Sequence, residues 1–107
     1  MNLRIFPPED FLEARVTLPL SKSMSARALI INALTPGSAP LGNVASCDDT
    51  DALVAALQGD SRSMSRTVDV GAAGTTMRFL TAYYACRPGC DITLDGSARM
   101  RQRPIKV

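Results

Sequence analysis

Proline and glycine breaks divide this 107-residue chain into short segments, and they constrain its fold more than any other feature. Thr35-Pro36-Gly37 and Arg87-Pro88-Gly89 each end a helical pattern, and Gly59 ends another. Segments with strand-like alternation of apolar and polar residues lie between them. This order of elements predicts an α/β or α+β fold.

Helices are predicted at 21–34, from 48 to Gly59, and from about Thr75 to the Arg87 break. Serines can cap the first helix, and Asp48 and Asp49 are interpreted as carboxylates that stabilise the start of the second. The predicted inward-facing residues are Met24, Ala28 and Ile31, then Leu53, Ala56 and Leu57, then Met77, Leu80 and Tyr84. Short strands are predicted within 1–18, 38–46, 68–70 and 92–94.

Composition excludes several classes of protein. The chain has no histidine and no C-x-x-C pair, so the usual zinc ligand sets and histidine-dependent nucleophilic sites cannot be built from it. No apolar run approaches the roughly 18 to 20 residues of a membrane span, and the N-terminus lacks a signal-peptide core. We therefore expect a cytoplasmic protein that binds no metal and no membrane.

Charge is distributed unevenly along the chain. Four basic and seven acidic residues give residues 1–60 a net charge of −3, whereas eight basic and three acidic residues give residues 61–107 a net charge of +5. Such an excess favours an anionic partner, either a nucleic acid or a small phosphorylated molecule, or forms a solvated face.

The segment Ser21–Arg27 is the first of three candidate anion sites. It places hydroxyls, the Lys22 ammonium and unpaired backbone N–H groups at a predicted helix start, where phosphate binds readily. Arg27 follows Ser23 by four residues and so lies on the same face. The alternative is a serine-capped helix whose Lys22 and Arg27 are merely solvated.

The second candidate is the small-residue turn Gly71-Ala72-Ala73-Gly74, which leads from a predicted strand into a predicted helix. Such a turn lets a ligand approach the backbone beside a helix N-terminus. It matches neither the P-loop nor the dinucleotide-binding fingerprint, and a purely structural turn is the alternative.

The third candidate is Arg99-Met100-Arg101-Gln102-Arg103, predicted to be extended with its arginines on one side. It suits a carboxylate, a phosphate or a nucleic-acid backbone. A small stand-alone RNA-binding α/β module that uses this tail is therefore an alternative function. The tail contains no aromatic residue that could stack on bases.

Together these motifs resemble those of the EPSP synthase (3-phosphoshikimate 1-carboxyvinyltransferase) family. The chain carries L-P-x-S-K-S-x-S-x-R at Leu18–Arg27, G-x-A-G-T-x-M-R at Gly71–Arg78, and G-x-x-R-M-x-x-R-P-I at Gly96–Ile105. The resemblance covers residues 16–107 and only the N-terminal portion of the family. The related UDP-N-acetylglucosamine enolpyruvyl transferases are similar in fold but have lysine-asparagine in place of Lys22-Ser23.

The resemblance implies a fold of βαβαββ units in two domains. Residues 19–107 would form part of the N-terminal domain, and residues 1–18 would be strands that belong with the second domain, beyond Val107. The chain thus looks truncated. Family members would be monomers, whereas the unpaired strands of 1–18 could pair two copies of this chain edge to edge.

The resemblance also implies transfer of the enolpyruvyl group of phosphoenolpyruvate to the 5-hydroxyl of shikimate 3-phosphate, with release of phosphate and without a cofactor. Lys22 would be catalytic and contact both substrates, Ser23 and Arg27 would bind shikimate 3-phosphate, and Gly74 and Arg99 would bind phosphoenolpyruvate. No nucleic acid would take part. The acid/base carboxylates of the family lie beyond Val107, so we expect this chain alone to be inactive.

Three positions depart from the family pattern: Ala72 replaces an asparagine, Phe79 a proline and Leu20 a glycine. The first two bear on phosphoenolpyruvate affinity and on sensitivity to glyphosate-type inhibitors.

Overall fold

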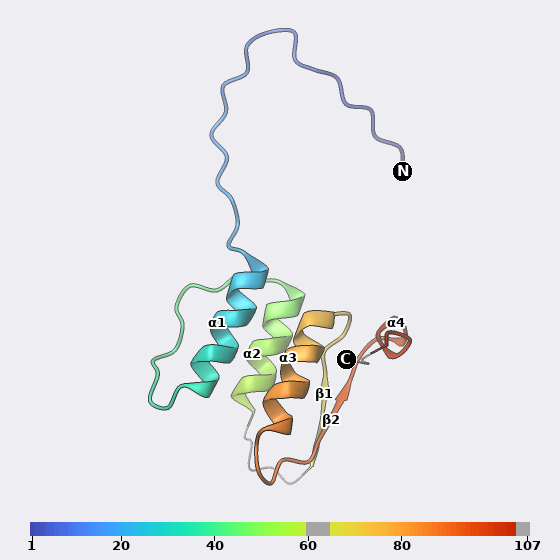
Figure 1. Cartoon of the computed structure of the whole chain (residues 1–107). Helices are drawn as coiled ribbons and strands as arrows, with labels where there is room; N and C mark the ends of the chain where they lie inside the picture. Colours follow the sequence, from blue (N-terminus) through green and yellow to red (C-terminus); the bar gives the residue numbers. More distant parts are fainter. Residues whose placement is uncertain (60–64, 105–107) are drawn as a thin grey trace.

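The computed structural model describes residues 1–59 and 65–104. Its elements are α1 (Lys22–Leu34), α2 (Asp48–Gln58), β1 (Arg66–Asp69), α3 (Gly74–Ala85), β2 (Ile92–Asp95) and α4 (Ala98–Arg101). The three long helices lie side by side with their N-termini at the same end, and the strands run along one side of α3 (Figure 1). This arrangement confirms the α/β class, while the finer βαβαββ unit stays a prediction.

The two strands pair in parallel, with Arg66 opposite Ile92 and Asp69 opposite Asp95. Parallel neighbours need a crossover connection, which α3 supplies. Two backbone bonds then join the loops that follow the strands: the N–H of Val70 donates to Asp95 O (2.9 Å) and that of Ser97 to Gly71 O (2.9 Å). The start of α3 and the segment leading into α4 are thereby held together.

The core lies between the helices and the sheet. The predicted inward residues of α3 are all buried, and so are Leu53 and Ala56 of α2, whereas Leu57 is only partly buried. Thr50 is also fully buried, although it is not among the predicted inward-facing residues. None of the helices described combines the length and hydropathy needed to cross a membrane.

The predicted buried face of α1 is largely wrong, since of its three residues only Ala28 is partly buried. Met24 and Ile31 are 67% and 64% exposed, and the helix instead buries Ala26, with Leu29 and Ile30 packed against the core. Apolar residues occupy both sides of α1, so their spacing alone does not select a face. Ser25 decides the orientation in part, because its buried Oγ accepts a hydrogen bond from Ala45 N (2.8 Å).

The strand predicted at 38–46 is also not formed. Two side-chain bonds fold the beginning of this segment back on α1 as a loop: Asn32 Nδ2 donates to Ala39 O (2.8 Å), and Ser38 Oγ donates to Asn32 O (2.8 Å). The following stretch ends in the Ala45 bond to α1 described above. These contacts favour helix packing over strand pairing.

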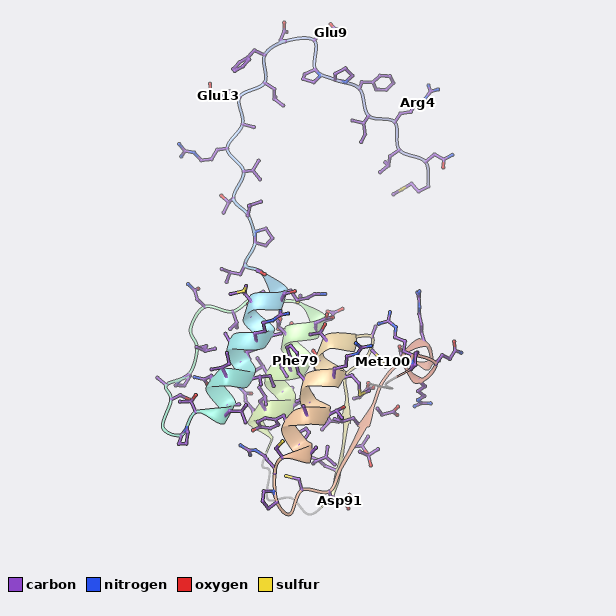
Figure 2. All side chains as sticks on the ribbon, viewed as in Figure 1. Arg4, Glu9, Glu13, Phe79, Asp91 and Met100 are labelled. Carbon is purple, nitrogen blue, oxygen red and sulfur yellow. The ribbon has the colours of Figure 1, made fainter. Side chains whose placement is uncertain are left out.

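No strand forms over residues 1–18 either. This segment leads away from the helices, and Arg4, Glu9 and Glu13 project from it into open space (Figures 1 and 2). A strand needs a neighbour to pair its backbone groups, and no described segment lies beside this one. Its assignment to a second domain, and its pairing in a dimer, stay predictions.

The tail predicted to be extended instead forms α4. Ser97 caps it, accepting a bond from Met100 N (3.2 Å), and Met100 is buried against the core. The helical turn spreads Arg99 and Arg101 around α4, so they do not form the row along one side on which the RNA-binding alternative depends. The last residue of the third motif, Ile105, lies outside the described residues.

Arg101 makes a two-point contact with Asp95 at the end of β2. Its Nε and Nη2 donate to Oδ1 (2.8 Å) and Oδ2 (2.6 Å). The Arg101 hydrogen bonds, and then the bond from Gly96 N, lower the pKa of Asp95 from 3.8 to about 2. The carboxylate therefore stabilises the fold fully above about pH 4, and this contribution is lost as the pH falls through about 2.

We expect Asp95→Asn to lower the free energy of unfolding at pH 7 and to make no difference below pH 2. Urea titrations of the two proteins between pH 7 and pH 2 measure this convergence. Asp91→Asn, at an exposed carboxylate just before β2, is the control and should be neutral throughout. A difference between wild type and Asp95→Asn that persists unchanged at pH 2 would contradict the assignment.

Candidate anion-binding site

An open pocket of about 450 Å³ lies at the end of the molecule where the helices begin. It is formed by the first turns of α1, α2 and α3 together with the segment that follows α4. Its charged lining residues are Lys22, Asp49, Arg78 and Arg103. Three cations thus face one carboxylate, which leaves the pocket with an excess of positive charge.

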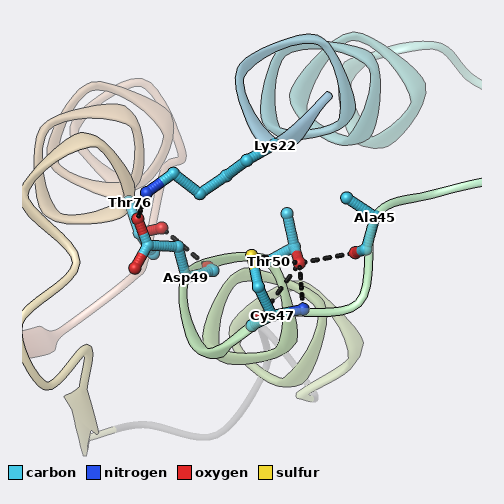
Figure 3. Close-up of polar contacts among 6 residues, drawn as sticks. All are labelled: Lys22, Ala45, Cys47, Asp49, Thr50 and Thr76. Atoms are coloured by element: carbon cyan, nitrogen blue, oxygen red, sulfur yellow. Dashed lines mark hydrogen bonds and ion pairs between the residues drawn. The ribbon is translucent and has the colours of Figure 1, made fainter. Parts of the chain in front are cut away.

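Lys22 is the first residue of α1, placed there by the Ser21 cap, whose Oγ accepts from Met24 N (3.4 Å). Its Nζ lies 2.8 Å from Asp49 Oδ2, across the gap between α1 and α2 (Figure 3). The hydrogen bond and the charge of Asp49 raise the pKa of Lys22 above its ordinary value. Lys22 is therefore a firmly protonated ammonium group.

Thr50 anchors the start of α2 (Figure 3). Its buried Oγ1 donates to Ala45 O (2.6 Å) and accepts from Cys47 N (3.2 Å). Its hydrogen bonds with Cys47 lower the pKa of that thiol. The bonds fix the backbone from Ala45 into the first turn, where Asp49 lies.

The start of α3 closes the other side of the pocket. Gly71 adopts a left-handed φ of 56°, and its N–H donates to Asp69 Oδ1 (2.8 Å), which turns the chain out of β1. Thr76 Oγ1 then donates to Asp49 O (2.9 Å) and ties α3 to α2. This bond between the Thr76 hydroxyl and the Asp49 carbonyl holds the starts of α2 and α3 in a fixed position relative to each other.

Gly74 leaves room for an arginine. A Cβ on Gly74 would lie 2.9 Å from a terminal nitrogen of Arg103, so the guanidinium approaches the backbone of α3 closely. α3 has no acidic residue in its first turn, and its N-terminal end carries partial positive charge. The Arg103 guanidinium and the N-terminus of α3, which lie close together, form a site suited to an anion.

The structure brings together only some of the predicted site residues. Lys22 and Gly74 line the pocket, whereas Ser23, Arg27 and Arg99 do not. Arg27 donates to Ser23 O (2.9 Å) and lies 5.9 Å from the ring centroid of Phe79. Arg99 is exposed on α4.

Sequence reasoning missed Asp49, Arg78 and Arg103 as pocket residues. Arg78 and Arg103 belong to the second and third motifs, and this membership could have identified them as candidate site residues. Asp49 lies in the first turn of α2, as predicted, and in addition it forms an ion pair with Lys22, which the sequence did not reveal. The described residues contain no group of three or more His, Cys, Asp or Glu side chains that could hold a metal ion.

A parallel βαβ unit with helix N-termini and cationic side chains around one pocket is typical of α/β proteins that bind small anionic molecules. The comparisons with known proteins are more specific. The family model for EPSP synthase (3-phosphoshikimate 1-carboxyvinyltransferase) matches residues 7–59 and 58–107, and the chain belongs to this family.

Relatives named 3-phosphoshikimate 1-carboxyvinyltransferase are similar over most of this chain. One from Bacteroides fragilis is 47% identical over 90% of the chain, and one from Yersinia pestis is 39% identical over 92%. A third, from Halalkalibacterium halodurans, carries the same name with the number 2 and is 33% identical over 98%. The matched regions are only 22%, 28% and 27% of those proteins. No solved structure matches significantly.

Proposed function

We propose that this chain provides part of the substrate site of an enzyme that transfers the enolpyruvyl group of phosphoenolpyruvate to the 5-hydroxyl of shikimate 3-phosphate. The observation that carries the proposal is the pocket that joins Lys22 to the N-terminus of α3. Family membership supplies the substrates, and the chemistry of the pocket agrees with them, because both are phosphorylated carboxylates. The reaction belongs to a cytoplasmic protein and uses no cofactor.

The pocket residues bind and orient the substrates. The Lys22 ammonium lies where it can contact anionic groups of both, and the backbone at Gly74 offers N–H donors to phosphoenolpyruvate. Ser23 and Arg27, which lie on the first turns of α1, and Arg99 on α4 are proposed to join them when the substrates are bound. Fixed positive groups of this kind stabilise negative charge that develops at the reacting atoms.

Proton transfer needs acid/base groups, and those of the family are proposed to lie outside this chain. The chain alone should therefore bind a substrate without turning it over. An enolpyruvyl transfer rate measured with the purified 107-residue protein would contradict this division of roles.

We expect Lys22→Met to weaken shikimate 3-phosphate binding about ten- to a hundredfold, since a hydrogen bond to a charged group contributes about 1.5–3 kcal/mol. Amide NMR titration of the wild-type chain and the variant measures the dissociation constant. Arg87→Met is the matched control: it also removes one positive charge, but at the far end of α3, beside Tyr83.

The same titration is repeated with inorganic phosphate and with a short RNA as control ligands. Saturable shifts at Ser21–Arg27 with shikimate 3-phosphate alone support the proposal. Shifts confined to the residues around α4 and produced by RNA would instead favour the RNA-binding alternative. Equal weakening by Lys22→Met and Arg87→Met would show that binding depends on net charge and not on the pocket.

A further inference from the structure

Asp49 places a negative charge in a pocket that is proposed to bind anions. Its carboxylate lies 2.8 Å from Lys22 Nζ, and its side chain is 26% exposed, against 57% for Lys22. Both residues line the same pocket. Direct repulsion from this carboxylate would weaken the binding of any anion there, so its position needs a physical explanation.

Stabilisation of the N-terminus of α2 does not explain why the Asp49 carboxylate faces the pocket. Cys47 and Thr50 already bond with each other at the start of the helix, and Asp48 and Asp51 place two exposed carboxylates in the same first turn. The side chain of Asp49 instead extends away from α2 toward the end of Lys22 (Figure 3).

The backbone of Asp49 is fixed as well as its side chain. Thr76 Oγ1 donates to Asp49 O (2.9 Å), so Asp49 is tied to α3 through its carbonyl and to α1 through its carboxylate. Thr76 is buried, which protects that bond from competition with water. Asp49 therefore connects the starts of all three long helices around the pocket.

We propose that Asp49 is a positioning residue, which holds the Lys22 ammonium in the pocket beside the N-terminus of α3 before a substrate binds. This inference rests on the proposed function of the pocket. A free lysine side chain loses much rotamer freedom when it binds a ligand, and an ion pair that orders it beforehand reduces that loss. The same pairing keeps Lys22 charged, in agreement with its raised pKa.

Asp49→Asn separates positioning from simple repulsion, because asparagine keeps the size and removes the charge. Positioning predicts that shikimate 3-phosphate binds the 107-residue chain about tenfold more weakly, the size expected for one ordered charged contact. Inorganic phosphate, which needs no particular Lys22 geometry, should bind equally well or more tightly. The matched control is Asp48→Asn, the same change one residue away at an exposed site, which should leave both affinities within about twofold.

Asp49→Glu tests rescue. It restores the negative charge on a longer side chain, so it should recover part of the affinity for shikimate 3-phosphate. Equal or tighter binding of shikimate 3-phosphate by Asp49→Asn would overturn the proposal, because Asp49 would then act as a repulsive charge alone. Amide spectra of each variant show whether it is folded.

A measurement without ligand keeps this inference distinct from the proposed function. The chain has only two lysines, Lys22 and Lys106, so the side-chain NMR signals of Lys22 are readily assigned during a pH titration. Asp49→Asn should lower the pKa of Lys22 more than Asp48→Asn does. If the wild-type chain does not bind shikimate 3-phosphate, the proposed function fails for this chain, whereas an unchanged Lys22 titration in Asp49→Asn overturns the positioning role by itself.

Discussion

Replacing Leu80 with alanine should lower the free energy of unfolding by about 2–5 kcal/mol, the range for a large-to-small change in a packed core. Leu80 is fully buried on α3, in the cluster that joins the helices to the sheet. Domains of this size are stable by only about 5–15 kcal/mol, so the loss is a large fraction of the total. Urea denaturation followed by circular dichroism measures it.

Leu34→Ala is the matched control for this change. Leu34 is exposed at the end of α1, so the same atoms are removed without leaving a cavity, and the effect should stay within about 0.5 kcal/mol. Similar losses for the two variants would mean that Leu80 does not lie in a packed core in solution.

Gly96→Ala is expected to have the second large effect, about 2–4 kcal/mol, from overpacking together with one weakened hydrogen bond. A Cβ on Gly96 would lie 2.6 Å from the backbone O of Gly71 and 2.9 Å from Met100 Cγ. That carbonyl also accepts the bond from Ser97 N that joins the two loops. The loops must therefore separate to admit the methyl group.

The separation should also reach the pocket, since Met100 lines it and Gly71 begins the turn into α3. We expect amide shifts at Gly74–Met77 in the NMR spectrum of Gly96→Ala, besides the lower stability. Gly42→Ala is the control: no atom lies within 4 Å of its added Cβ, and its φ is not in the left-handed region, so it should be neutral or slightly stabilising. Equal stability of Gly96→Ala and wild type would contradict the close approach of the two loops.

The sequence predicted the helices better than the strands, for a physical reason. Helix bonds are local, so the Ser21 cap and the breaks at Pro36 and Pro88 were sufficient to place α1 and the end of α3. Strands need partners distant in sequence, and the alternation in 38–46 carries no information about whether a partner exists. Asn32 and Ser38 decided that segment through side-chain bonds that no periodicity reveals.

The candidate site was predictable in part. Lys22 and Gly74 belong to motifs at helix starts, and the parallel packing of α1 and α3 brings them to one pocket. The role of Asp49 was not predictable, since a carboxylate in a first turn looks the same whether it faces water or a lysine. Only the packing of α2 against α1 distinguishes the two.

The common direction of the three long helices also bears on how quickly a ligand arrives. The N-termini of α1 and α3 each carry about half an elementary positive charge, with no acidic residue in their first turns to offset it. Three carboxylates in the first turn of α2 act in the opposite sense, whereas the cations that line the pocket, Lys22, Arg78 and Arg103, add to the positive charge. An anion within a Debye length of about 8 Å is therefore drawn toward this end of the molecule before any contact forms. Association rates of anionic ligands should accordingly fall with ionic strength more steeply than dissociation rates change.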